Sequence, residues 1–401
     1  MLSLSMIVRD EAARLEACLA SVADFVDEMV VVDTGSRDDT VAIARRLGAT
    51  VLELAWPGDF APARNQALEK VRGDWVLVLD ADERLRPEAR EPLRRLMAEP
   101  AALVITLLRR ELGAAQAPYS AVSRLFRRHP ALRWSRPYHS MIDDSVLDLQ
   151  AREPHWRVLH CPEPALLHDG YRAEPLADGR KAARLRAAME ADLEERPGDA
   201  YALAKLAGLE LREGRRGRAV ALLRQGLAAC PGSAHAERFE LLLGLAMALS
   251  GTDPDQAAAL YGQALALPLD PRLTAAARLN LALLRQGQGR LAEAAELAAE
   301  VTAAAPELTN AWIALGVIER QRGRPTAAIA AYRRALERDP HQAEAHQNLA
   351  VAQLMAGDIV GARQSFRTAI ARLQLQGRAA EAAELARRAG QLVVLDGEDP
   401  R

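Results

Sequence analysis

The stretch from Trp75 to Arg86 reads WVLVLDADERLR, an apolar run that ends in three clustered carboxylates. Trp75 to Leu79 contains no polar residue and has Val at two positions, which is typical of a strand buried on both faces. Asp80, Asp82 and Glu83 follow at its C-terminal end, where open α/β sheets place their ligands. Because such carboxylates repel one another, a divalent cation would stabilise them, and the cluster indicates metal-assisted chemistry on a phosphorylated substrate. The acidic first turn of a helix is the alternative interpretation.

The segments on the N-terminal side of this stretch alternate strand and helix patterns. Strands are expected over residues 4–8, 29–32 and 49–54, and helices over 10–22, 38–47 and 61–71. Alternation of this kind predicts a parallel, doubly wound sheet. A further apolar strand is expected over 103–108, after which prolines break the pattern up to about residue 170.

A different sequence pattern begins at about residue 178, where strand patterns disappear and alanine becomes frequent. Prolines recur at intervals of 34 residues, from Pro197 to Pro231 and again from Pro306 to Pro340. This is the period of the tetratricopeptide repeat, a helix–turn–helix unit. The clearest copy begins at Thr309 and matches the repeat pattern at Trp312, Leu315, Gly316, Ala328, Tyr332, Ala335 and Pro340. The small residues allow two helices to approach closely, while the large ones fill the space between them.

Other copies extend the pattern over the rest of the chain. Copies begin at Ala200 and Ala343, weaker ones span about 236–270 and 275–306, and a helix over about 377–394 is expected to cap the stack. The sequence thus predicts an α/β domain over 1–172, a connecting helix over 173–196 and an all-α domain of about five repeats over 197–395. An unrelated alanine-rich bundle is the alternative.

Size and composition exclude several classes of protein. The 401 residues allow two or three domains, and a net charge of −2 gives no indication of nucleic acid or an anionic membrane as a partner. Three scattered cysteines without CxxC spacing are typical of reduced thiols in the cytosol. The apolar segment over residues 1–8 is too short for a signal peptide, and no run approaches the ~20 residues of a membrane span. We therefore expect a cytoplasmic protein without a transmembrane segment.

The first ~170 residues resemble family 2 glycosyltransferases of the GT-A fold, in the branch that often carries C-terminal tetratricopeptide repeats. The matching segments follow the family's order: SMIVRDEAARLEACLASV (5–22), DEMVVVDTGSRDDTVAIA (27–44), FAPARNQAL (60–68), GDWVLVLDADERL (73–85), SRLFRRHPALRW (123–134) and LLHDGY (166–171). The resemblance implies a GT-A-type sheet domain that binds a nucleotide-sugar donor.

The resemblance also implies roles for residues on the donor side. Asp33 matches the residue that accepts hydrogen bonds from the nucleotide base, although it could instead cap the turn that follows it. Arg64 and Asn65, near the start of the third helix, match the segment that approaches the base or diphosphate, with a solvated surface arginine as the alternative. Asp80 matches the ribose-side carboxylate, and Glu11 an acidic residue near the base pocket or, equally, a first-turn helix glutamate.

Two residues match the metal ligands of the family. Asp82 resembles the direct ligand of an Mg²⁺ or Mn²⁺ ion that bridges the donor diphosphate, and His168 resembles a further ligand near the end of the domain. A structural histidine is the alternative for His168. Tyr171 is expected to pack rather than to line the acceptor side.

The family pattern fails where the general base is expected. In this branch a Trp-Gly-x-Val-His-Glu type segment follows the LFR motif, and the corresponding region here reads WSRPYHSMIDDSV. Trp134 and His139 are in place, but Ser140 occupies the position of the glutamate. Asp143, or its neighbour Asp144, could replace it, and Glu83 is another candidate. We favour Asp143 as the base.

The resemblance implies an inverting, metal-assisted glycosyltransferase of the hexosyltransferase type, with UDP as the expected donor nucleotide. The repeats are expected to present a concave surface to a peptide or partner protein, so the acceptor is a protein, a peptide or a cell-surface glycan. A repeat scaffold with a catalytically impaired donor-binding domain is the alternative. A nucleotidyltransferase is disfavoured, because RDEAARLE follows the first strand where a Gly-rich, basic triphosphate loop would be needed.

Overall fold

The computed structural model describes residues 1–136, 140–170 and 179–395. Contacts divide the chain into two compact units, Met1–Leu209 and Glu210–Arg401. Within the described ranges, none of the helices combines the length and apolar character needed to cross a bilayer.

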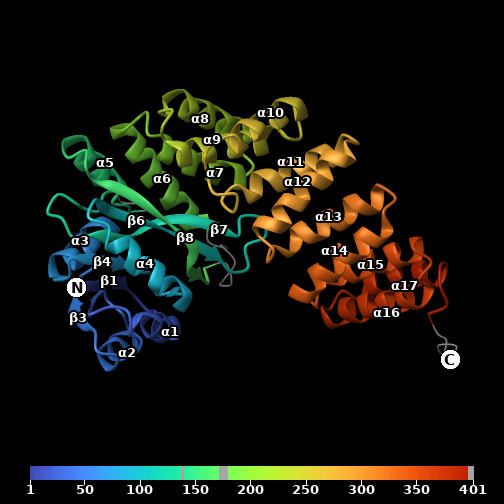
Figure 1. Ribbon diagram of the computed structural model, residues 1–401, viewed down its shortest axis with the longest axis horizontal. Coiled ribbons are helices and arrows are strands. Elements are labelled where there is room, and N and C mark those ends of the chain that lie inside the picture. The colour runs from blue at the N-terminus through green and yellow to red at the C-terminus, as the bar shows by residue number, and fades with distance from the viewer. Residues whose placement is uncertain (137–139, 171–178, 396–401) are drawn as a thin grey trace. The chain divides into compact units, whose positions relative to one another are not determined.

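The first unit is built on one mixed sheet of eight strands (Figure 1). The strands are β1 (Leu2–Val8), β2 (Glu28–Asp33), β3 (Thr50–Glu53), β4 (Trp75–Val78), β5 (Glu83–Leu85), β6 (Ala102–Glu111), β7 (Tyr119–Arg127) and β8 (Arg157–His168). Their order is β3-β2-β1-β4-β7-β6-β8-β5. The first four are parallel as predicted, but β7 is antiparallel to β4 and β6, and β5 is antiparallel to β8. The sheet is therefore parallel on one side and mixed on the other.

Helices cover both faces of this sheet. They are α1 (Ala12–Val22), α2 (Thr40–Arg46), α3 (Phe60–Lys70), the 3₁₀ turn η1 (Pro87–Ala89), α4 (Arg90–Met97) and α5 (Asp143–Arg152), followed by α6 (Gly179–Glu195). One apolar core joins the sheet to α1, α2 and α4, and a second core joins its opposite face to α3 and α5. Trp75 and Leu77 enter the first core while Val76 and Val78 enter the second, so β4 is buried on both faces as its sequence predicts.

The acidic cluster after β4 forms a tight turn and not the start of a helix. The backbone N–H of Glu83 donates to the carbonyl of Asp80 over 2.9 Å, and the N–H of Asp80 donates to the Glu83 carboxylate over 2.9 Å. The chain then enters β5, whose register pairs Glu83 with His168 on β8. The turn thus directs the carboxylates back along the edge of the sheet.

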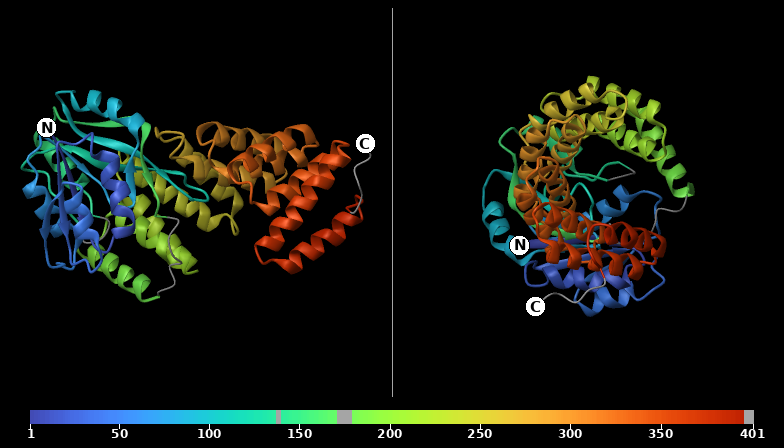
Figure 2. Two further views of the ribbon diagram at one scale, coloured as in Figure 1. Left: turned by 90° about the horizontal axis from the view of Figure 1, so that it is seen from below. Right: turned by 90° about the vertical axis from the view of Figure 1, so that its right-hand side faces the viewer.

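The helices of the second unit pack against one another in consecutive pairs and follow an arc in the right-hand view of Figure 2. α7 (Ala200–Arg212) and α8 (Arg216–Ala229) come first along the chain. The pairs are then α9 (His235–Leu249) with α10 (Pro254–Leu265), α11 (Ala275–Gly287) with α12 (Leu291–Ala304), α13 (Thr309–Gln321) with α14 (Pro325–Arg338), and α15 (Ala343–Met355) with α16 (Ile359–Leu375), before α17 (Ala379–Gly390). The predicted fold class, an α/β domain followed by an all-α helical repeat, is confirmed. The limits at residues 172 and 197 remain predictions, since the contacts divide the chain inside α7.

Glycine has two distinct uses in this repeat. Gly289, Gly323 and Gly357 end successive first helices with positive φ at intervals of 34 residues, the conformation that closes a helix with least steric cost. Gly316 on α13 serves close packing instead, because a Cβ there would lie 2.5 Å from the ring of Tyr332 on α14. The predicted pairing of small and large residues is therefore present between α13 and α14.

Candidate active site

Seven charged side chains from four strands and one turn form a continuous series of contacts at the carboxyl edge of β4. We call this series the charge ring, and its members, in order of contact, are Asp80, Arg124, Glu83, Arg109, Glu111, His168 and Asp82. Acidic and basic groups alternate along this series from Asp80 to Asp82, so each charge that is removed from water has an oppositely charged neighbour.

The first half of the ring surrounds Asp80. Arg64 on α3 donates from Nη2 to Asp80 Oδ1 over 2.6 Å, and Arg124 on β7 donates to the other oxygen. Although burial opposes ionisation, the two guanidinium groups hold the pKa of Asp80 far below its usual range. Arg64 also lies over the ring of Trp134 at 4.8 Å, and its buried Nε and Nη1 have no hydrogen-bond partner within the described part of the chain.

Glu83 is the most deeply buried member of the ring. Its side chain has no exposed surface, and Arg109 Nη1 donates to it over 2.6 Å while Arg124 lies 3.7 Å away. A carboxylate held in this way has no access to an incoming nucleophile. The geometry therefore does not suit the role of general base that the sequence offered for Glu83, and it supports a structural role.

The second half of the ring holds the histidine. His168 Nδ1 lies 2.5 Å from Glu111 Oε2, and its Nε2 lies 3.3 Å from Asp82 Oδ2. Burial disfavours the imidazolium, but hydrogen bonds with Asp82 and Glu111 outweigh it and raise the pKa of His168 to about 9. Asp82 is anchored further, because the N–H of Asp169 donates to the Asp82 carbonyl over 3.0 Å.

Glu11 lies beside the ring, at the residue before α1. Burial, which Arg14 partly opposes, and the nearby carboxylate of Asp82 raise the pKa of Glu11. Arg14 also approaches Asp82 Oδ2 at 3.7 Å. Glu11 therefore belongs to the same electrostatic environment as the charge ring.

Two predicted donor residues have their polar groups engaged elsewhere. The carboxylate of Asp33 accepts the N–H groups of Gly35 and Ser36, each over 3.0 Å, and the Ser36 hydroxyl. This is the turn-capping role given above as its alternative. Asn65 accepts from the Trp134 N–H over 2.8 Å and donates to the Trp134 carbonyl over 2.9 Å, so it anchors that segment and does not point at the ring.

A bulge in β7 places Asp143 on the same face of the sheet as Asp80. Ile105 pairs with Leu125 and Leu107 pairs with Val122, so β7 carries one extra residue at this point. Val122 and Leu125 consequently pack against the same core although they are three positions apart. The two residues between them, Ser123 and Arg124, therefore share the opposite face, where Arg124 holds Asp80 and the Ser123 hydroxyl donates to Asp143 over 2.7 Å.

Asp143 and Asp144 begin α5 in contrasting environments. Burial raises the pKa of Asp143, and the hydrogen bond from Ser123 only partly opposes it. Burial acts in the same direction on Asp144, but hydrogen bonds from Arg136 and Ser135 outweigh it and lower the pKa of that carboxyl. A carboxylate with a raised pKa is the better proton acceptor, so the structure favours Asp143 over Asp144 as a base.

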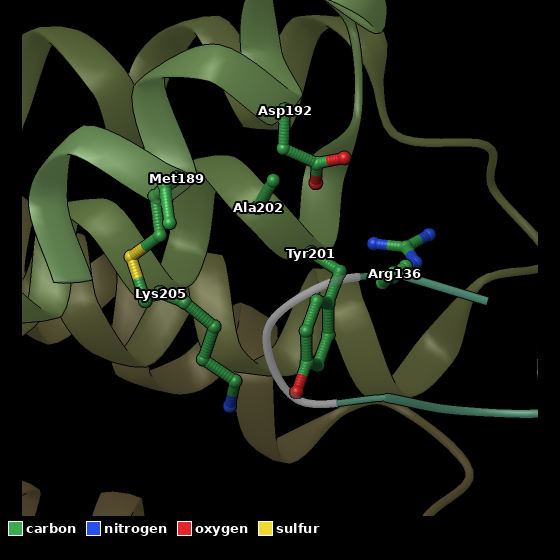
Figure 3. A pocket seen from close by; sticks show the side chains of 7 residues that line it. Arg136, Met189, Asp192, Tyr201, Ala202 and Lys205 are labelled. Carbon is green, nitrogen blue, oxygen red and sulfur yellow. The ribbon is translucent and has the colours of Figure 1, made fainter. Parts of the chain in front are cut away.

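Arg136 fixes the segment that leads into α5. It has a positive φ of 73°, an unusual conformation for a residue with a side chain. It contacts Asp144 and Asp199 with two hydrogen bonds each, between 2.8 and 3.0 Å long, and lies over the ring of Tyr201 at 5.3 Å. Figure 3 shows the small pocket beside it, to which Tyr201 and Lys205 of α7 also contribute. Arg136 thus joins the start of α5 to the start of α7.

The sequence did not reveal three members of the ring, Arg109, Glu111 and Arg124. Arg109 and Glu111 end the apolar strand LVITLLRRE, where they are two positions apart and share one face, and Arg124 precedes the buried pair Leu125 and Phe126 in the more polar strand YSAVSRLFR. Charges on one face of a buried strand are a usable signal of such a site. Two positions noted in the sequence, His139 and Tyr171, lie outside the described residues.

Comparisons with known proteins show the family to which the chain belongs. The model for glycosyl transferase family 2 matches residues 3–158, and the tetratricopeptide repeat model matches residues 247–309 and 313–375. The chain is similar to a TPR repeat-containing protein of Synechococcus elongatus, with 45% identity over 94% of this chain and 93% of that protein. An uncharacterized glycosyltransferase of Rickettsia felis is 33% identical over 36% of this chain and 54% of its own length. The chain therefore belongs to the family 2 glycosyltransferases and carries C-terminal tetratricopeptide repeats.

More distant similarities cover single parts of the chain. The glycosyltransferase SunS of Bacillus phage SPbeta is 37% identical over 19% of each chain. Among solved structures, a MamA double mutant covers 44% of this chain and 96% of its own with 21% identity and a TM-score of 0.40. YrrB, described as a TPR protein with an unusual peptide-binding site, covers 49% of this chain and 97% of its own with 18% identity and a TM-score of 0.40.

Proposed function

We propose that the protein is an inverting glycosyltransferase that moves a sugar from a UDP-sugar donor to a protein, peptide or cell-surface glycan acceptor. The observation that carries this proposal is the charge ring, which brings Asp82 and His168 together beside Asp80 at the carboxyl edge of the sheet. Open α/β sheets bind their ligands at this edge.

The pair formed by Asp82 and His168 fits a divalent cation, Mg²⁺ or Mn²⁺. Two ligand atoms that bind one Mg²⁺ ion at ~2.1 Å and at right angles are separated by about 3 Å, and Asp82 Oδ2 and His168 Nε2 are 3.3 Å apart. Among the described residues no group of three His, Cys, Asp or Glu side chains could hold a metal ion alone. This agrees with an ion that takes its other ligands from water and the donor diphosphate. When bound, such an ion would neutralise charge on the leaving nucleoside diphosphate.

The residues around the pair have distinct roles in the proposed reaction. Arg64 is suited to the diphosphate, because its Nε and Nη1 remain unpartnered within the described ranges. Asp80 would accept from the ribose after exchanging part of its contact with Arg64 or Arg124. Asp33 keeps its turn in place beside the base pocket, and Asn65 holds Trp134 under Arg64.

Asp143 is the proposed general base. The acceptor hydroxyl or other nucleophile attacks the anomeric carbon while the bond from that carbon to the diphosphate oxygen breaks, and the Asp143 carboxylate takes the acceptor proton. Burial and the raised pKa of Asp143 suit this transfer. The repeats are proposed to bind the acceptor or a partner through a peptide segment.

Donor binding tests the proposal directly. At 100 times its Kd, UDP-sugar with Mn²⁺ should stabilise the protein by about 2.7 kcal/mol, or about 5–10 °C in Tm. Asp82→Ala should abolish the shift, whereas Asp24→Ala, at an exposed carboxylate of the same unit, should leave it unchanged. Slow hydrolysis of one UDP-sugar should accompany binding and be lost in Asp82→Ala.

Two outcomes would contradict the proposal in different ways. If no nucleotide sugar shifts the Tm with Mn²⁺ or Mg²⁺, the donor site is wrong. If donors bind but no donor is hydrolysed, and none is consumed when lysate supplies acceptors, the alternative holds, namely a repeat scaffold with a catalytically impaired domain.

A further inference from the structure

Glu111 is a buried carboxylate for which the proposed reaction has no direct use. It is the last residue of β6, and the parallel register pairs it with His168, the last residue of β8. Paired residues on neighbouring strands direct their side chains to the same face. The Glu111 side chain is only 4% exposed, so it cannot reach a donor or an acceptor.

One oxygen of the Glu111 carboxylate is held by neighbouring side chains, and this orients the other oxygen toward His168. Oε1 accepts from Arg109 Nε over 2.9 Å and from the Ser120 hydroxyl. Oε2 is then directed at His168 Nδ1, 2.5 Å away. With Nδ1 held there, the opposite ring nitrogen of His168 faces Asp82.

The other side of the imidazole is limited by Gly170. A Cβ at this glycine would lie 2.5 Å from both Cε1 and Nε2 of His168, closer than any real contact. The imidazole ring of His168 therefore occupies space that only glycine leaves open at residue 170, while Glu111 contacts its Nδ1. Two independent features thus define one orientation of His168.

We infer that Glu111 is a positioning residue that orients His168 as a ligand for the divalent cation, with Gly170 providing the space for the ring. This inference rests on the metal site of the proposed function. A carboxylate only accepts hydrogen bonds, so it requires the proton of a metal-bound imidazole to be on Nδ1 and leaves the Nε2 lone pair for the ion. A glutamine at residue 111 could rotate its amide and donate to Nδ1, which would stabilise the wrong tautomer.

The test measures Mn²⁺ affinity of the full chain by the loss of the free-ion EPR signal, with UDP present and without any turnover. Glu111→Leu should weaken Mn²⁺ binding about 10–100-fold. Glu111→Gln keeps the size of the side chain, and its Mn²⁺ affinity should lie between that of Glu111→Leu and that of the natural protein. Gly170→Ala should weaken binding without removing a charge. Ser120→Ala removes one hydrogen bond from the other oxygen of Glu111 and should change affinity less than about threefold.

A second readout reports the orientation itself. The hydrogen bond from His168 Nδ1–H to Glu111 Oε2 should give a downfield proton signal in the natural protein and in Ser120→Ala, and this signal should be absent from Glu111→Leu. Circular dichroism identifies variants that are folded, and Glu111→Gln and Gly170→Ala keep the inference testable if Glu111→Leu does not fold.

The outcomes separate this inference from the proposal on which it rests. If His168→Ala weakens Mn²⁺ binding and the Glu111 and Gly170 variants do not, the inference is wrong and the metal site stands. If His168→Ala also binds Mn²⁺ with normal affinity, His168 is not a metal ligand, and the proposed function is wrong on that point before the inference is tested. If Ser120→Ala weakens binding as much as Glu111→Leu, the effect is one of general packing and the inference is wrong.

Discussion

Asp143 and Asp144 are neighbours in sequence whose carboxyl groups respond to the fold in opposite ways. The folded pKa of Asp143 lies above its unfolded value, so its ionisation reduces stability as pH rises through that interval. The folded pKa of Asp144 lies below its unfolded value, so its ionisation adds stability at neutral pH that is lost as pH falls. The pair offers an internal control for the proposed base.

We expect Asp143→Asn to raise Tm at pH 7 and to have little effect at a pH below both pKa values. The amide keeps an acceptor for the Ser123 hydroxyl but removes the buried charge. The same change should lower donor hydrolysis by about 10²–10⁴-fold if Asp143 is the general base. In the natural protein, hydrolysis should decline with acid at a pH above the usual range of an aspartate.

Asp144→Asn is the matched control. It should lower Tm at pH 7, because Arg136 loses a charged partner. The decline of donor hydrolysis as pH falls should be the same as in the natural protein. Thermal unfolding and hydrolysis measured across pH give both results. Equal losses of hydrolysis in the two variants would assign the effect to the position of α5 and not to a base.

At the scale of elements, the close approach of α13 and α14 depends on one missing side chain. Gly316→Ala should destabilise the repeat by about 1–3 kcal/mol, because its Cβ would meet the buried ring of Tyr332. The same substitution at Gly262, on the exposed face of α10 with open space around it, should stabilise by up to about 1 kcal/mol. Chemical denaturation of both variants checks the contrast, and a Gly316 variant as stable as the Gly262 variant would contradict it.

The strands show what a sequence can predict and what it cannot. β4 and its parallel neighbours follow from local patterns, since apolar runs and intervening amphipathic helices lie within a few dozen residues. The antiparallel position of β7 and the bulge that places Ser123 beside Arg124 depend on pairing with β4 and β6. Such pairing leaves no short-range pattern, so the link from Asp143 to Asp80 could not be predicted.

The same distinction holds for the site. Asp82 and His168 were predicted as a pair from the family resemblance, and the structure places them 3.3 Å apart. Glu111 was not predicted, because its partner His168 is 57 residues away and no local pattern connects them. Glu83 was assigned to possible catalysis because sequence shows neighbours but not burial, and its side chain is completely buried.

For the whole molecule, two separate sets of contacts predict two unfolding transitions. Calorimetry should resolve one transition for the unit Met1–Leu209 and one for Glu210–Arg401. UDP-sugar with Mn²⁺ should raise the Tm of the first transition only, since the charge ring, Arg64 and Asp143 all lie within residues 1–209. Gly316→Ala should lower the Tm of the second transition only, by about 2–4 °C for each kcal/mol of unfolding free energy that is lost. A single transition that responds to both changes would show that the units unfold together.

The alternating pattern of the charge ring has a consequence for the speed of donor capture. When no divalent cation is bound and His168 is protonated, as its raised pKa favours, the ring and Arg64 together contain four acidic and four basic groups. A site whose charges cancel projects little field into solution and gives an incoming anionic nucleotide no long-range steering. Association of a nucleotide measured without a divalent cation should therefore change little between low and physiological ionic strength, and this cation-free site would select its ligand by contact after collision, not by attraction from a distance.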